Sequence, residues 1–306
     1  MKKVQCQSTG IIYTAKIYKD TISDIYSRNE FLALQHISGE NIVQVIQIVQ
    51  LGVYTKKSGT QYQCSYILME SLPNGDLYKA IKIMNKPRSE MVRFLFSKVL
   101  KAVESVHAAG FACGNLKIEN FYIDSNFNVK LTDFSYSRPL DDDFSYKPLS
   151  SKYTPPEIFR SSTFLPQAGD IFSAGVILFT LQTLNFPFNS SKPLDLHYSQ
   201  LAKNPKVFWE MHKKAHKGLI LDDGFKDLIE NMLCCEPKIR ASLDNVKNHE
   251  WVKGEIADFE DFRDEIIKNK DKDFGENDRK NLWRNRLCKQ SSGKSYEYQD
   301  NVVGEN

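Results

Sequence analysis

Over the first seventy residues, short apolar runs are divided by polar turn residues, a pattern typical of β-strands. The runs lie at residues 4–7, 11–18, 43–55 and 62–70. Turn signals at residues 8–10 and 57–59, each ending in glycine, separate the two members of each pair. Residues 23–37, between the pairs, carry apolar side chains at helical spacing. The pattern predicts a small antiparallel sheet with one helix packed on it.

After residues 72–75, Leu-Pro-Asn-Gly, the pattern changes to long helical periods. A helix is predicted over residues 89–109, where apolar residues recur on one face. Two short extended segments follow, at residues 121–123 and 129–131. The rest of this region is mostly helical. We therefore expect a β-rich lobe over residues 1–70 and an α-helical lobe over residues 71–252.

Residues 253–306 form a charged tail with few apolar residues. Two surface helices are predicted in it, at residues 259–268 and 279–289, before a flexible end. The second helix is basic and carries a partial apolar stripe of Leu282, Trp283 and Leu287. It is interpreted as a helix packed back on the larger lobe, with a partner-docking helix as the alternative.

Charge and composition exclude several classes of protein. The 306 residues include 41 basic and 38 acidic ones, and a net charge of +3 gives no reason to expect a nucleic-acid or membrane partner. No apolar run follows the charged residues at the start of the sequence, so no secretory signal is expected. The longest apolar stretch, residues 172–181, is about half of the roughly 20 residues that span a bilayer. The six cysteines form no CxxC pair. We expect reduced thiols and a cytoplasmic location, with association with the cytoskeleton left open.

The clearest chemical signal lies in two neighbouring segments. Residues 111–124 read Phe-Ala-Cys-Gly-Asn-Leu-Lys-Ile-Glu-Asn-Phe-Tyr-Ile-Asp, and residues 129–135 read Val-Lys-Leu-Thr-Asp-Phe-Ser. Together they resemble the catalytic loop (HRDLKxEN) and the metal-binding turn (DFG) of eukaryotic protein kinases of the serine/threonine type. Further segments resemble other motifs of the family, and all of them occur in the same order along the chain as in the family. They lie at residues 14–16, 66–70, 153–157, 169–175, 236–240 and 249–251. The resemblance covers residues 1–252 and implies an α+β, bilobal protein-kinase-like fold.

The resemblance also implies a nucleotide site. Lys16 matches the family lysine that holds the phosphates, and Glu30 matches its acidic partner. Residues 66–70 resemble the hinge, with Met69 at the gatekeeper position followed by Glu70, and Leu72 lies just after this segment. These five residues are the predicted nucleotide-binding residues.

Three further residues match family positions at the reacting phosphate. Asn120 and Asp133 are implied as magnesium ligands if nucleotide binds, and Lys117 matches the lysine that contacts the transferred phosphate. Outside the site, the family equivalents of Glu157 and Arg240 form a buried ion pair, so the same pair is expected here.

Other positions depart from the family pattern. Asn115 stands where the catalytic aspartate belongs, and an amide cannot take the proton of the substrate hydroxyl. A positioned general base is worth about 10² to 10⁴ in rate. Cys113 and Gly114 replace the histidine and arginine of the same motif, and Ser135 replaces the glycine of DFG. The first strand and the glycine-rich loop of the family are not found, because their place would precede Met1.

These departures favour a catalytically inactive kinase homologue, a pseudokinase, and the expectation is therefore that the protein is not an enzyme. Its expected role is a protein-binding scaffold or assembly component, with other proteins as partners through the larger lobe and the tail. No cofactor is required on this interpretation, although weak binding of ATP and magnesium stays open. Two alternatives remain: a weak or atypical serine/threonine kinase that uses ATP and magnesium, and a nucleotide-binding switch without phosphoryl transfer. The kinase alternative is supported by the retained residues, Lys16, Glu30, Lys117, Asn120 and Asp133.

Overall fold

The computed structural model describes residues 2–18, 25–56, 58–85, 87–141, 152–160, 165–215 and 220–273. The chain divides into two compact units. The first consists of residues 1–23, 45–72 and 258–306, and the second consists of residues 24–44 and 73–257. The predicted division near residue 70 into two lobes stays a prediction, and so does the packing of a helix on the sheet.

The first unit contains an antiparallel sheet. Its strands are β1 Lys2–Gln5, β2 Ile12–Tyr18, β3 Val45–Thr55 and β4 Gln61–Met69, in the spatial order β1-β2-β4-β3. Neighbouring strands are all antiparallel, which confirms the predicted sheet. β1 ends two residues earlier than the predicted run, because the Gly10 N–H donates to the Cys6 carbonyl at 2.8 Å and turns the chain there. A buried cluster on this sheet consists of Cys6, Tyr13, Ala15 and Leu68.

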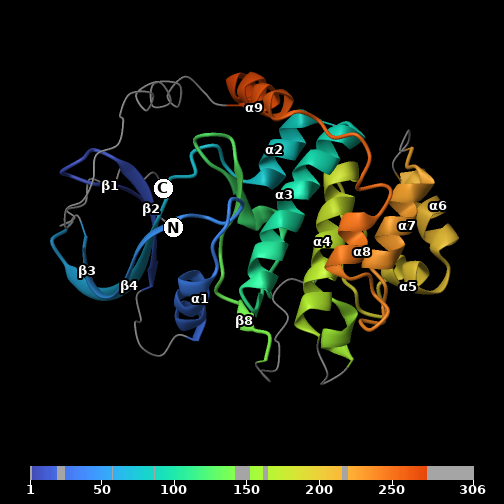
Figure 1. Ribbon diagram of the computed structural model, residues 1–306, viewed down its shortest axis with the longest axis horizontal. Coiled ribbons are helices and arrows are strands. Elements are labelled where there is room, and N and C mark those ends of the chain that lie inside the picture. The colour runs from blue at the N-terminus through green and yellow to red at the C-terminus, as the bar shows by residue number, and fades with distance from the viewer. Residues whose placement is uncertain are drawn as a thin grey trace. The chain divides into compact units, whose positions relative to one another are not determined.

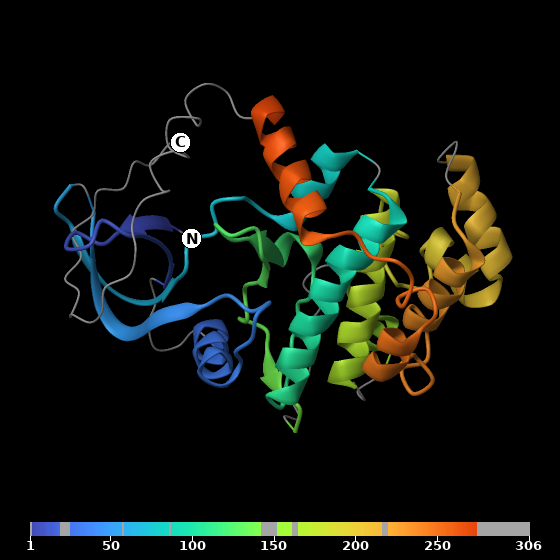
Figure 2. The ribbon, with the colours of Figure 1, turned by 45° about the horizontal axis from the view of Figure 1, so that its top comes forward.

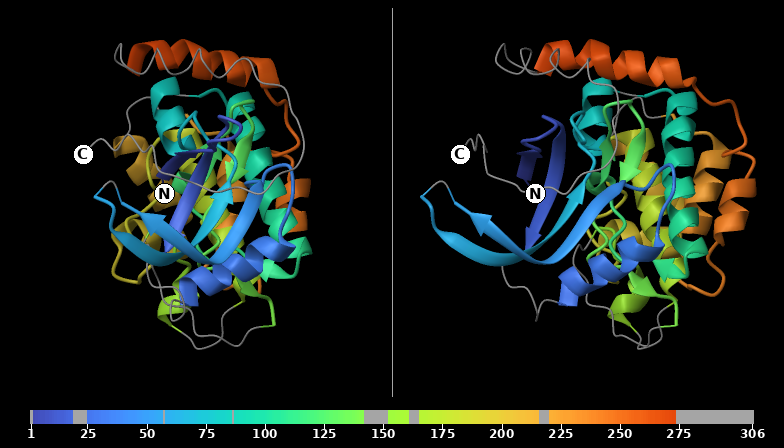
Figure 3. Two further views of the ribbon diagram at one scale, coloured as in Figure 1. Left: turned by 90° about the vertical axis from the view of Figure 1, so that its left-hand side faces the viewer. Right: turned by 60° about the vertical axis from the view of Figure 1, so that its left-hand side comes forward.

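The β3–β4 hairpin is long and strongly twisted (Figure 3). Its register shifts between Val45 and Gln47 and again between Val49 and Gly52. At Gly52 a Cβ atom would lie 2.7 Å from the ring of Tyr66, so only glycine fits at this irregularity. The hairpin returns the chain along β4 to Met69, within the segment at residues 66–70 that resembles the hinge.

The second unit is mainly helical. Its helices are α1 Ile25–His36, α2 Leu77–Met84, α3 Ser89–Ala108, α4 Pro166–Thr183, α5 Leu196–Lys203, α6 Pro205–Ala215, α7 Asp223–Met232 and α8 Leu243–Asn248. Two short hairpins carry the motif residues, pairing β5 Phe111–Ala112 with β8 Arg138–Pro139 and β6 Phe121–Ile123 with β7 Val129–Leu131. Two short 3₁₀ helices lie at η1 Ile118–Asn120 and η2 Pro156–Phe159. The mixed α+β content that the pattern predicted is confirmed.

Helix α4 forms the centre of the second unit. It lies between α3 and α7 (Figures 1 and 2) and is buried along nearly all of its length. The close approach to α7 requires Gly175, where a Cβ atom would lie 2.9 Å from side-chain atoms of Met232 and Leu233. Because its apolar surface is covered on several sides, α4 is the buried core helix that the apolar stretch predicted. Among the described residues, no helix is both long and apolar enough to cross a membrane.

The tail contributes helix α9 Phe259–Asp273, which begins where the pattern predicted and continues five residues further. Its Phe262 and Ile266 side chains are buried. The predicted basic helix at residues 279–289 lies outside the described residues.

Candidate active site

The loop that resembles the kinase catalytic loop is held through its backbone by an aspartate of α4. Asp170 Oδ2 accepts the Cys113 N–H at 2.8 Å, and its Oδ1 accepts the Gly114 N–H at 3.1 Å. His107, near the end of α3, donates from Nε2 to Asp170 Oδ2 at 2.8 Å. Gly114 has φ +72°, a left-handed conformation that glycine adopts without strain. The loop therefore stays anchored although two of its family side chains are replaced.

Cys113 replaces the family histidine but keeps a link to the turn that follows Asp133. Its carbonyl accepts a hydrogen bond from the Ser137 hydroxyl at 3.1 Å. The thiol is buried, and burial, with the nearby Asp170 carboxylate as a second cause, raises its pKa well above the ordinary value. The Cys113 side chain is therefore a neutral packing group, and it cannot substitute for the missing general base.

Asn115 and Asn120 form the next part of the site. The Asn120 amide donates from Nδ2 to the Asn115 carbonyl at 3.1 Å, which fixes the Asn120 side chain. Asn120 Oδ1 is the acceptor atom of this amide, an oxygen of the type that magnesium accepts as a ligand. Lys117 lies between these two asparagines, and its carbonyl accepts the Asn120 N–H at 3.0 Å. The structure thus groups Asn115, Lys117 and Asn120 on one short loop.

Asp133 is brought to this loop by the residue before it. The backbone N–H and the hydroxyl of Thr132 both donate to the Asn120 carbonyl at 2.9 Å. These bonds hold the chain that enters Asp133 against the chain that leaves Asn120. Asp133 itself has φ +64°, a strained value for a residue with a side chain.

The pair of Asn120 and Asp133 fits a magnesium site by its donor chemistry. Magnesium in nucleotide enzymes is held by one or two protein oxygen ligands together with phosphate oxygens and water. A carboxylate and an amide oxygen from two hydrogen-bonded segments supply that set. Among the described residues, no three or more His, Cys, Asp or Glu side chains are placed so that they could hold a metal ion together, so these residues form no all-protein metal cage.

Glu30 on α1 contacts the turn after Asp133. Its side chain is 1% exposed. Glu30 Oε1 accepts the Phe134 N–H at 3.3 Å, and Oε2 accepts the Ser135 hydroxyl at 2.6 Å. Phe134 itself is buried. The structure therefore brings Glu30 and the metal-binding turn together, which sequence order alone did not show.

The remaining predicted residues lie in or next to the sheet of the first unit. Lys16 is on β2, opposite Ile67 of β4, and its ammonium group lies 5.6 Å from the centroid of the Tyr18 ring. Met69 is buried at the end of β4, and Glu70 and Leu72 follow it. Since Lys16 and Glu30 belong to different units, their pairing stays a prediction.

The buried ion pair expected from the resemblance is confirmed. Arg240 donates from two guanidinium nitrogens to the two carboxylate oxygens of Glu157, each at 2.8 Å. Four positions before Glu157, the Tyr153 hydroxyl donates to Glu119 at 2.9 Å. Burial, with Glu119 as a second cause, raises the pKa of Tyr153, so this tyrosine stays neutral.

Sequence reasoning missed the anchoring role of Asp170. The available signal was a single carboxylate at the start of the most apolar part of the chain, where an uncompensated charge would be costly. Ser137 was also missed, and nothing in the sequence distinguishes it from other polar loop residues.

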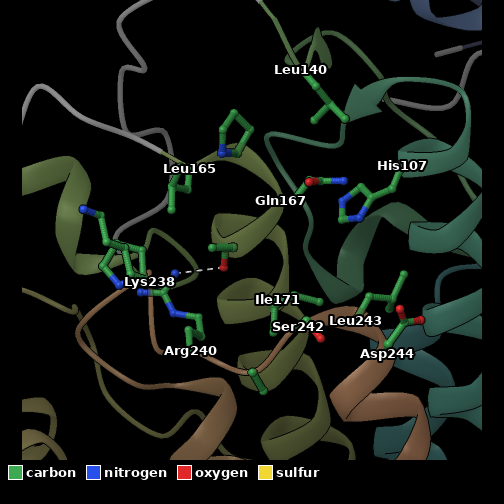
Figure 4. A pocket seen from close by; sticks show the side chains of 14 residues that line it. His107, Leu140, Leu165, Gln167, Ile171, Lys238, Arg240, Ser242, Leu243 and Asp244 are labelled. Atoms are coloured by element: carbon green, nitrogen blue, oxygen red, sulfur yellow. Dashed lines mark hydrogen bonds between the residues drawn. The ribbon is translucent and has the colours of Figure 1, made fainter.

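A surface pocket of about 700 Å³ lies elsewhere in the second unit (Figure 4). Figure 4 shows His107 and Leu140 on one side of it and Lys238 on the other. The Arg240 guanidinium, which donates to the Ala168 carbonyl at 2.8 Å, forms part of its wall. None of the predicted nucleotide or metal residues lines this pocket, so it is separate from the candidate active site.

Comparison with known proteins agrees with this geometry. The sequence model of the protein kinase domain matches residues 2–252. Maternal embryonic leucine zipper kinase of Xenopus laevis is 25% identical over 76% of this chain. SNF1-related protein kinase catalytic subunit alpha KIN12 of Arabidopsis thaliana is 29% identical over 62% of it. Testis-specific serine/threonine-protein kinase 1 of Mus musculus is 29% identical over 61% of it.

The similarity covers only part of each relative. The matched region makes up 34% of the Xenopus protein, 37% of the Arabidopsis protein and 51% of the mouse protein. The chain thus spans between a third and about half of the length of these relatives.

These findings correct one expectation. The prediction that the protein is not an enzyme is wrong, because the kinase domain model covers most of the chain and the relatives are named as protein kinases. The prediction rested on the side chains at residues 113–115, on Ser135 and on the glycine-rich loop that was not found. With a β-sheet lobe, a helical lobe and a protein kinase domain model that matches residues 2–252, the chain belongs to the protein kinase family.

Proposed function

We propose that the protein is an ATP- and magnesium-dependent serine/threonine protein kinase whose transfer step is slowed by the absence of a catalytic carboxylate. The observation that carries this proposal is the joining of Asn120, Asp133 and Glu30 through the hydrogen bonds of residues 132–135. A carboxylate and an amide oxygen on two hydrogen-bonded segments are the ligands that a magnesium–nucleotide complex requires, whereas the fold alone does not require them.

The chemistry supports a working enzyme without the aspartate. Phosphoryl transfer passes through a loose transition state, so catalysis rests mainly on positioning and electrostatic stabilisation. When bound, magnesium would neutralise charge that develops on the phosphate oxygens. Asn120 and Asp133 would hold the ion, and Lys117 would place a positive charge beside the transferred group.

Asn115 would orient the substrate hydroxyl through its amide. It cannot accept the proton, which would pass instead to a phosphate oxygen or to water. Loss of a positioned base lowers rates by about 10² to 10⁴, so slow transfer is expected rather than none. The lysine between Asn115 and Asn120, together with the family relatives, favours serine and threonine over tyrosine as the acceptor.

The test is single-turnover transfer from ³²P-labelled ATP to a serine/threonine peptide library at high protein concentration. The parent protein should label peptides in a magnesium-dependent reaction, and Asp133→Asn should lower the rate at least 100-fold. Asp223→Asn, which changes an exposed aspartate of α7, is the matched control and should label at the parent rate. Equal labelling by the parent and Asp133→Asn would show that a contaminating kinase is responsible and would contradict the proposal.

A further inference from the structure

The hydroxyl of Ser135 lies between two carboxylates. Ser135 Oγ is 2.6 Å from Glu30 Oε2 and 2.9 Å from Asp133 Oδ1. Glu30 lies on α1, 105 positions earlier in the sequence, whereas Asp133 is the predicted magnesium ligand two residues before Ser135. One hydroxyl thus joins a helix to the carboxylate that is expected to bind metal.

The surroundings make this arrangement tight. Ser135 is 7% exposed and Glu30 is 1% exposed, so water competes little for these hydrogen bonds. Asn29, the neighbour of Glu30 on α1, donates from Nδ2 to the Ser135 carbonyl at 3.2 Å. With the Phe134 N–H bond to Glu30, three hydrogen bonds from two side chains of α1, Asn29 and Glu30, hold residues 134–135.

The number of protons limits what the hydroxyl can do. A serine hydroxyl carries one proton and donates it to one acceptor at a time. Glu30 and Asp133 therefore compete for the same proton, and the shorter distance shows that Glu30 is the closer acceptor. A cation on Asp133 would take over charge that the hydroxyl otherwise balances and would leave the proton to Glu30. Metal binding at Asp133 and the hold of Ser135 on α1 would then strengthen each other, because coupling between two sites is reciprocal.

We propose that Ser135 is a positioning residue that couples magnesium binding at Asp133 to helix α1 through Glu30. This inference rests on the proposed function for its biological meaning, but the coupling itself does not require phosphoryl transfer. A glycine at this position has no hydroxyl and provides neither contact.

The first test measures magnesium affinity at saturating ATP from the magnesium-dependent rise in melting temperature. Ser135→Ala should weaken apparent magnesium affinity threefold to tenfold and leave ATP affinity in EDTA unchanged. Ser191→Ala is the matched control, because it also removes a buried hydroxyl, but one whose hydrogen bond goes to the Thr154 carbonyl and not to a predicted metal residue. It should leave magnesium affinity within twofold of the parent. Equal magnesium affinity in the parent and Ser135→Ala would overturn the proposal.

A second test removes the dependence on one variant. Glu30→Gln keeps the shape of the side chain and should also weaken magnesium binding. The double variant, Ser135→Ala with Glu30→Gln, should lose no more magnesium affinity than the single variant that binds magnesium more weakly. Additive losses would show independent roles and overturn the coupling. If magnesium binding follows these predictions but no peptide is labelled, the proposed kinase function fails while the role of Ser135 stands. If the parent shows no magnesium-dependent shift, the role of Ser135 is refuted.

Discussion

Two regions of the helical unit follow the protein kinase pattern to different degrees. The Glu157–Arg240 ion pair keeps both family side chains, whereas the loop at residues 113–115 keeps none of the three. The structure shows why these losses differ in consequence. The ion pair is formed by the side chains themselves, but the loop is held by its backbone N–H groups on Asp170. A loop anchored in this way can change its side chains and keep its geometry.

The largest expected effect tests the side-chain anchor. Arg240→Ala should lower the free energy of unfolding by about 3 to 5 kcal/mol, because it leaves Glu157 buried without its partner. Urea unfolding measures this loss. Lys238→Ala, two residues away and exposed, is the control and should change the free energy by less than about 0.5 kcal/mol. Similar values for both variants would show that the ion pair does not anchor the fold.

The next effect tests the backbone anchor. Asp170→Asn should cost about 2 to 3 kcal/mol, because an amide NH₂ group would face a backbone N–H or His107 and leave a buried donor unpaired. Asp76→Asn is the control, since Asp76 caps α2 and asparagine caps helices about as well. The same urea titration applies. If Asp170→Asn lowers the free energy of unfolding no more than Asp76→Asn does, Asp170 does not anchor the loop.

The smallest effect concerns Cys113, where the side chain is only a packing group. Burial raises its pKa, so the folded protein keeps the thiol proton while the unfolded chain loses it as pH rises through about 9. Stability should therefore fall with pH above 9, and this residue should contribute about 1.4 kcal/mol per pH unit. Cys113→Ala should show a shallower fall between pH 9 and 10 in unfolding titrations. Identical slopes would mean that the thiol is not protected by the fold.

The same contrast explains what the sequence could predict. Alternation and helical spacing located the strands of the sheet and helix α3, and the segments at residues 121–123 and 129–131 match β6 and β7. The run predicted from residue 43 begins two residues later as β3, because the Val43 N–H donates instead to the Leu131 carbonyl at 3.0 Å. The pattern of apolar residues does not distinguish a residue of the strand from one whose backbone hydrogen bond goes to another part of the chain.

Motif order also identified the residues of the site, but not what holds them. The contact between Glu30 and Ser135 joins residues 105 positions apart, and the bonds to Asp170 use backbone atoms that every sequence shares. Neither leaves a local signal. The prediction of an inactive protein was wrong because it gave the substitutions at residues 113–115 and 135 and the missing glycine-rich loop more weight than the match to the kinase domain over residues 2–252.

The most direct test of this account compares Asn115→Asp with the parent in the single-turnover transfer assay. If the backbone anchors keep the loop in place, a carboxylate at residue 115 should raise the rate by about 10² to 10⁴, the usual worth of a positioned base. Asn126→Asp adds the same charge at an exposed turn and should leave the rate unchanged. A rate for Asn115→Asp equal to that of the parent would show that the loop does not hold a catalytic geometry.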